Sequence, residues 1–106
     1  DLVRSRGLGD VYKRQVLNKA TFQVSIGGKI LPKITRQEFA ILELLLRNPK
    51  QVFSKEEIFE YAWDEPYMGE TKTLDVHISN IRKKIKTVTS EEYIETVWGI
   101  GYRLHL

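Results

Sequence analysis

Hydrophobic and polar positions alternate in the first ordered part of the chain. Within residues 22–26, apolar side chains occupy every second position, which is the period of a strand with one buried face. Gly27 and Gly28 follow, and glycine supplies the positive φ angles that a tight hairpin turn needs. The chain then returns through residues 29–34. This pattern predicts a β-hairpin.

Two capping boxes then mark the starts of two helices. In such a box a Ser or Thr side chain accepts from a backbone amide three residues on, and a Glu at that position reaches back. Thr35 with Glu38 makes the first pair, and Ser54 with Glu57 the second. The first helix, expected to end near Arg47, is apolar around most of its circumference, which predicts a buried central helix.

A third helix is predicted from about Thr73 to Lys86, and its two sides differ in chemistry. On a helical wheel an apolar stripe contains Leu74, Ile78, Ile81 and Ile85. The opposite side contains Lys72, Val76, Ser79, Asn80, Lys83 and Lys86, with His77, Arg82 and Lys84 on the flanks. Residues 72–86 hold five Lys or Arg against one acid, whereas the whole chain carries only +3. Positive charge is therefore concentrated on this helix.

Such a helix matches the major groove of duplex DNA. The phosphates that border the groove attract Lys and Arg, and the base edges offer hydrogen-bonding groups and thymine methyls. Ser79 and Asn80 are suited to base edges, Val76 to a thymine methyl, and Lys83 to a phosphate. From this helix alone, a solvated surface whose lysines only maintain solubility is the alternative.

Residues 93–106 predict a second hairpin, with its turn at Gly99-Ile100-Gly101. The hairpin carries Thr96, Trp98, Tyr102 and Arg103. A short hairpin with these side chains can follow a sugar-phosphate backbone or reach a minor groove. For Trp98 and Tyr102 the alternative is that the rings cap the hydrophobic core.

Composition limits the other functions of the chain. Its 106 residues fit one domain, and the absence of cysteine excludes disulfides, thiolate metal sites and cysteine nucleophiles. No apolar run approaches the roughly 20 residues of a membrane span. Neither His77 nor His105 has a matching set of acids. We therefore expect a soluble cytoplasmic protein that is not an enzyme and needs no cofactor or metal.

Residues 1–15 show neither helical nor strand periodicity. We interpret them as an N-terminal tail that is disordered or foreign to the domain, and residues 16–106 as the domain itself. The alternative is a basic arm that reaches DNA.

Four motifs together resemble a known family. They are ITRQEF at 34–39, VFSKEEIFEYAW at 52–63, TLDVHISNIRKK at 73–84 and IETVWGIGYRL at 94–104. In this order and spacing, over about residues 16–106, the chain is similar to the OmpR/PhoB-type effector domain of bacterial two-component response regulators. The resemblance implies an α+β winged helix-turn-helix with an N-terminal antiparallel sheet, three helices and a C-terminal β-hairpin wing.

The resemblance also implies a function and its residues. Members of this family control transcription by sequence-specific binding of double-stranded promoter DNA, with the third helix in the major groove. Positions that match their DNA contacts are Lys72, Val76, His77, Ser79, Asn80, Arg82, Thr96, Trp98 and Tyr102. The residues Asp64, Glu65, Tyr67 and Glu70 match the loop that relatives present to RNA polymerase. A phosphoryl-accepting receiver domain is expected in the full-length protein and is absent from this sequence.

Three positions depart from the family pattern. Many relatives carry arginine where Trp98 stands, which puts minor-groove insertion by this wing in question. Some carry arginine where Ser79 and Asn80 stand, so the phosphate grip or the sequence preference can differ here.

A winged-helix module that binds protein and not DNA is the alternative function, because a fold alone does not fix function.

Overall fold

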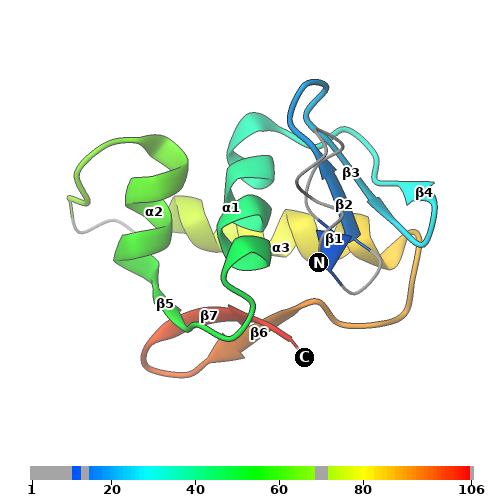
Figure 1. The fold of residues 1–106 in the computed structure, drawn as a ribbon. Coiled ribbons are helices and arrows are strands. Elements are labelled where there is room, and N and C mark those ends of the chain that lie inside the picture. Colours follow the sequence, from blue (N-terminus) through cyan, green and yellow to red (C-terminus); the bar gives the residue numbers. More distant parts are fainter. Residues whose placement is uncertain (1–10, 13–14, 69–71, 106) are drawn as a thin grey trace.

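The structure is a computed structural model that describes residues 11–12, 15–68 and 72–105. These residues form two antiparallel sheets and three helices (Figure 1). In chain order the elements are β1 (Val11–Tyr12), β2 (Gln15–Asn18), β3 (Gln23–Ile26), β4 (Lys29–Ile30), α1 (Arg36–Arg47), β5 (Phe53–Ser54), α2 (Lys55–Trp63), α3 (Lys72–Lys86), β6 (Ile94–Val97) and β7 (Gly101–Leu104). The α+β architecture predicted from the sequence is confirmed.

The N-terminal sheet has the strand order β1-β2-β3-β4. The predicted hairpin is confirmed as β3 and β4, and Gly27 and Gly28 take φ angles of 58° and 85° in the turn. The expectation that regular structure begins at Val16 is wrong, because β1 and the first residue of β2 lie in the segment predicted as a tail. A two-residue strand is too short to show a period, so only its pairing reveals it. The rest of that segment, residues 1–10 and 13–14, lies outside the described residues.

Both predicted capping boxes are present. The amide of Glu38 donates to Thr35 Oγ1 and the amide of Thr35 donates to Glu38 Oε1, at the start of α1. Ser54 and Glu57 make the same two bonds at the start of α2. Four orphan amides are thereby satisfied, which fixes where each helix begins. None of the described helices is long and apolar enough to cross a membrane.

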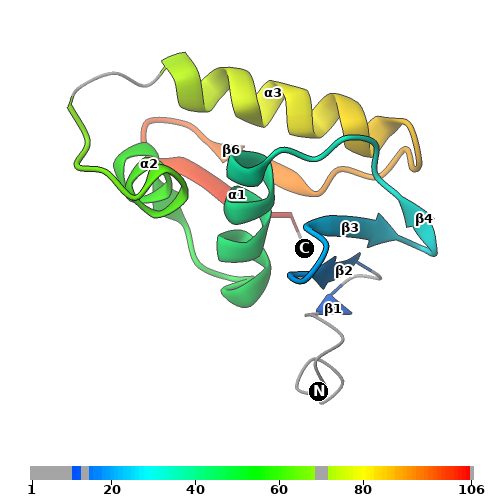
Figure 2. The ribbon, with the colours of Figure 1, turned by 90° about the horizontal axis from the view of Figure 1, so that it is seen from above.

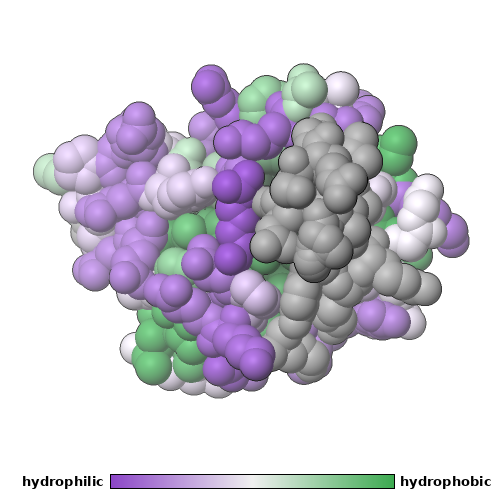
Figure 3. All heavy atoms as spheres, viewed as in Figure 1, coloured by the Kyte–Doolittle hydropathy of each residue, from purple (hydrophilic) through white to green (hydrophobic). Residues whose placement is uncertain are grey.

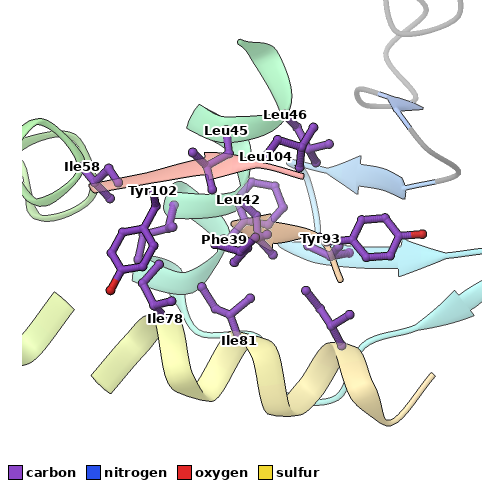
Figure 4. Packing of buried hydrophobic residues seen from close by; sticks show 14 of the residues in the cluster. Phe39, Leu42, Leu45, Leu46, Ile58, Ile78, Ile81, Tyr93, Tyr102 and Leu104 are labelled. Carbon is purple, nitrogen blue, oxygen red and sulfur yellow. The ribbon is translucent and has the colours of Figure 1, made fainter. Parts of the chain in front are cut away.

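The hydrophobic core lies between α1 and its neighbours. Figure 4 shows Ile78 and Ile81 pointing from α3 toward Phe39 and Leu42 of α1. All four residues of the predicted stripe on α3, which are Leu74, Ile78, Ile81 and Ile85, are buried. The orientation predicted for this helix is therefore confirmed, and its polar side must face outward.

The C-terminal sheet has the order β5-β7-β6. The predicted second hairpin is confirmed as β6 and β7, in which Thr96 pairs with Tyr102. β5 is an addition that the sequence pattern did not predict, again because it has only two residues. Gly101 packs against it so closely that a Cβ atom there would lie 2.0 Å from the carbonyl oxygen of Phe53. This contact explains a glycine at the first residue of β7, directly after the turn of the hairpin.

Candidate nucleic-acid interface

One side of α3 is open to solvent along the helix. Figure 2 shows α3 on the outside of the molecule, with none of the described elements beyond it. Its exposed residues include Val76, Ser79, Lys83 and Lys86, and Asn80 is half-buried. α3 begins at Lys72, but the side chain of Lys72 lies outside what the structure describes. The cationic side predicted from the wheel is therefore the side left free by packing.

Arg82 connects α3 to the hairpin. Its Nη2 donates to the carbonyl oxygen of Ile94 at 3.0 Å and to Thr96 Oγ1 at 2.8 Å. Two hollows lie between α3 and the hairpin, and Arg82 and Thr96 line both of them. The guanidinium thus links α3 to β6 between these two hollows. Arg82 and Thr96, both predicted to touch DNA, are therefore bonded to each other.

Lys84 is directed into the protein, away from the open side of α3. Its ammonium lies 2.6 Å from Glu38 Oε1 and 2.7 Å from the carbonyl oxygen of Lys33. The carboxylate of Glu38 is only 2% exposed, so this ion pair is largely shielded from water. Lys84 therefore fastens the last turns of α3 to the first turn of α1. The cations of α3 have different roles, although the sequence shows them as one run.

A polar network lines one of the two hollows between α3 and the hairpin. The Tyr102 hydroxyl donates to Asp75 Oδ1 at 3.0 Å, and Lys55 Nζ lies 3.3 Å from the same oxygen. The Tyr102 side chain is buried. Burial, with the bond to Asp75 as a smaller cause, raises the pKa of Tyr102 to about 12. Of the two roles left open for this tyrosine, its position favours the core.

His77 lies against α2. Its ring meets Trp63 edge-on at 4.9 Å, and its Nδ1 lies 2.8 Å from the carbonyl oxygen of Thr73. Trp63 in turn stacks on Phe59. These contacts place His77 between α2 and α3, next to the open side of α3.

The loop after α2 continues this aromatic cluster. Tyr67 contacts the Phe59 ring edge-on, and its amide donates to Glu60 Oε2. Asp64 and Glu65 are exposed. Glu70, the fourth residue expected in the polymerase-contacting loop, lies outside the described residues. Two acids are thus presented to solvent on a loop that an aromatic contact holds in place.

The hairpin has two different faces. Arg103 makes a bidentate pair with Glu95, with Nε–Oε1 at 3.1 Å and Nη2–Oε2 at 3.2 Å. The hydrogen bond from Arg103 lowers the pKa of Glu95. Because side chains alternate along a strand, this pair lies on the face opposite Thr96 and Tyr102. Arg103 is therefore paired within the wing and turned away from α3.

The turn of the hairpin is apolar. Trp98 is 88% exposed and Ile100 is 56% exposed. Of the two roles left open for Trp98, the exposure favours a contact outside the chain and not a cap on the core. Sequence reasoning missed Ile100, although an isoleucine between two glycines of a turn is a visible signal, since turns normally carry polar residues.

An open basic helix that packs against two other helices and lies beside a β-hairpin defines a winged helix-turn-helix. The family model described as the C-terminal domain of transcriptional regulatory proteins matches residues 31–104. The chain belongs to this family, the OmpR/PhoB-type effector domains, which bind DNA and regulate transcription.

Individual relatives agree with the family. The uncharacterized transcriptional regulatory protein YclJ of Bacillus subtilis is 39% identical over 87 residues, which are 82% of this chain and 38% of YclJ. Heme response regulator HssR of Staphylococcus epidermidis is 36% identical over 89 residues, 84% of this chain and 39% of HssR. The chain thus spans about two-fifths of the length of these relatives.

A solved structure gives the same result for the fold. The DNA-binding domain of response regulator AdeR, in complex with an intercistronic region, matches with a TM-score of 0.79 at 27% identity. The match covers 91% of this chain and 97% of that domain. The predicted fold is confirmed by this likeness.

Proposed function

We propose that this domain binds double-stranded promoter DNA in a sequence-specific manner, with α3 in the major groove and the β6–β7 hairpin as the wing. The observation that carries the proposal is the open side of α3, which presents cations and small polar groups while its isoleucines are buried. A major groove is wide enough to admit one helix. No other described helix combines an outward cationic side with a neighbouring hairpin.

The residues divide into phosphate contacts and base contacts. Lys72 and Lys83 would meet phosphates, as would Arg82, which has five N–H groups and uses Nη2 for the bridge. Base contacts would come from Ser79, Asn80 and the exposed Val76, with His77 beside them. On the wing, Thr96 and Trp98 would face the duplex. Tyr102 would instead hold the wing and α3 together, since it is buried and bonded to Asp75. Arg103 would reach a phosphate only at the cost of its pair with Glu95.

The whole protein is proposed to be a cytoplasmic two-component response regulator. A receiver domain would precede this one, as the partial coverage of its relatives suggests. The loop with Asp64, Glu65 and Tyr67, continuing to Glu70, would contact RNA polymerase, since its two exposed acids lie on a supported turn.

Salt dependence tests DNA binding directly. If three or four cations meet phosphates, log affinity for a duplex falls with log salt with a slope of about −3 to −4, because bound counterions are released. Selection of bound duplexes from a random pool supplies the site for this titration. A flat response would instead support the winged-helix module that binds protein.

Asn80→Ala tests base reading. We expect a loss of roughly 1–3 kcal/mol at one base pair and a relaxed preference there, because a bidentate amide contact discriminates between bases. Lys83→Ala is the control, which should weaken selected and random duplexes alike. Equal losses on both duplexes for Asn80→Ala would remove Asn80 from the base-reading set.

A further inference from the structure

The tip of the β6–β7 hairpin exposes two large apolar side chains, Trp98 and Ile100. In Figure 3 a green, hydrophobic patch lies at the lower left, where Figure 1 places the turn of this hairpin. Exposed apolar side chains that adjoin one another commonly mark a contact with another molecule. The tip is therefore a candidate contact surface.

The turn itself does not require these side chains. The Ile100 amide donates to the carbonyl oxygen of Val97, and Gly99 supplies the positive φ of 82°. Both features belong to the backbone, so polar residues at 98 and 100 would form the same turn. The apolar pair has no role in shaping the hairpin.

The tip also adjoins the proposed DNA face. One hollow is lined by Trp98 and Ile100 together with Asp75 and Arg82 of α3. If a duplex lay with its major groove on α3, its adjacent minor groove would therefore pass the hairpin tip. Continuity with this interface selects DNA over a protein partner as the occupant.

The chemistry of the tip fits one kind of groove. In the minor groove, A·T pairs present only acceptors, whereas G·C pairs add the 2-amino group of guanine, which points into the groove. Apolar side chains inserted there are used by other DNA-binding proteins to contact base steps. A tip of indole and isoleucine cannot accept a hydrogen bond from that amino group, so burying it would leave a donor unpaired.

We infer that Trp98 and Ile100 form an apolar minor-groove contact that selects A·T over G·C pairs at the position facing the wing. This inference rests on the proposed function and adds to it a second, independent element of sequence choice. It differs from an arginine contact, because an apolar contact contributes affinity without releasing counterions.

Inosine substitution tests the selection. An I·C pair keeps the major-groove groups of G·C but lacks the 2-amino group. In the duplex selected from the random pool, each A·T pair outside the segment read by α3 is replaced in turn by G·C and by I·C. We expect one or two positions at which G·C weakens binding and I·C restores it. If I·C weakens binding as much as G·C at every position, the inference is wrong.

Variants of the tip test which side chains act. Trp98→Ala and Ile100→Ala should each lower affinity by roughly tenfold, equivalent to about 1.4 kcal/mol, with the salt slope unchanged. Both should also lose the difference between A·T and G·C pairs. Ile30→Ala is the matched control, since Ile30 is 58% exposed on β4 of the other sheet, and it should bind as the parent does.

The outcomes separate the inference from the proposed function. If the parent protein binds with the expected salt slope and Trp98→Ala binds equally well, the apolar contact is refuted while DNA binding stands. A loss confined to duplexes with two adjacent sites would assign the tip to a second copy of the domain and would also refute it. A parent protein that binds no duplex refutes both.

Discussion

Lys83 and Lys84 are neighbours in the chain, but we expect their replacement to change different properties, DNA binding for Lys83 and stability of the fold for Lys84. Lys83 is exposed on the open side of α3. Lys84 is 22% exposed and pairs with the buried carboxylate of Glu38. Lys84→Met should therefore destabilise the fold and leave DNA contacts intact, whereas Lys83→Ala should weaken DNA binding and leave the fold intact.

The magnitude follows from burial. Removal of one partner from a buried ion pair costs about 3–5 kcal/mol, because a charge is left unpaired. Glu38 keeps the hydrogen bond from the Thr35 amide, so we expect about 3 kcal/mol for Lys84→Met. At roughly 4 °C per kcal/mol in a domain of this size, the midpoint of thermal unfolding should fall by about 12 °C.

Lys83→Ala should change stability by less than about 0.5 kcal/mol, as is usual for exposed positions. It should lower the salt slope of DNA binding by about 0.9, the contribution of one phosphate contact. Thermal unfolding followed by circular dichroism and salt titrations of duplex binding, at a temperature where both variants are folded, measure the two effects.

A second variant separates charge from packing. In Glu38→Gln with Lys84→Met, the buried charge is gone while a glutamine can still complete the capping box. This double variant should recover part of the stability lost in Lys84→Met. The reasoning fails if Lys84→Met unfolds at the parent's temperature, or if it lowers the salt slope as Lys83→Ala does, since Lys84 would then face DNA.

Two further predictions concern the core. Ile81→Ala should cost about 2–5 kcal/mol, because Ile81 is fully buried and its truncation leaves a cavity; an unchanged urea or thermal unfolding curve would show that α3 is turned differently. Tyr102 should make the domain less stable in alkali. Its folded pKa of about 12 exceeds the usual 10.0, so the folded state holds a proton that the unfolded chain releases. The stabilisation is present below pH 10.0 and lost as pH rises to about 12. Tyr102→Phe should lack this alkaline loss, so the unfolding free energy of the parent relative to the variant should fall as pH rises from 10.0 to about 12; a difference that stays constant with pH would contradict the shift.

The features predicted correctly from the sequence are local ones. A capping box joins residues three apart, and the buried stripe of α3 repeats within one helix, so both are visible in the order of residues. The two-residue strands β1 and β5 were missed because two residues cannot show a period, and only the pairing of β1 with the neighbouring β2 and of β5 with the distant β7 reveals them. Sequence period specifies elements that are long enough to repeat.

The roles of the charged residues depended on contacts across the chain. Glu38 was identified as a capping residue, but its second role requires Lys84, which is 46 residues away. Arg82 and its acceptors are 12 and 14 residues apart. A helical wheel shows on which side of the helix a residue lies. Only the packed fold shows whether that side contacts water or a neighbouring element.

The bridge from Arg82 to β6 has a consequence for the DNA. Since two hydrogen bonds tie the helix to the hairpin, the separation between them is set before any ligand arrives. A duplex that twists or narrows more easily between the two points of contact pays less elastic energy to conform to the protein. We therefore expect base pairs that no side chain touches to influence the choice of site.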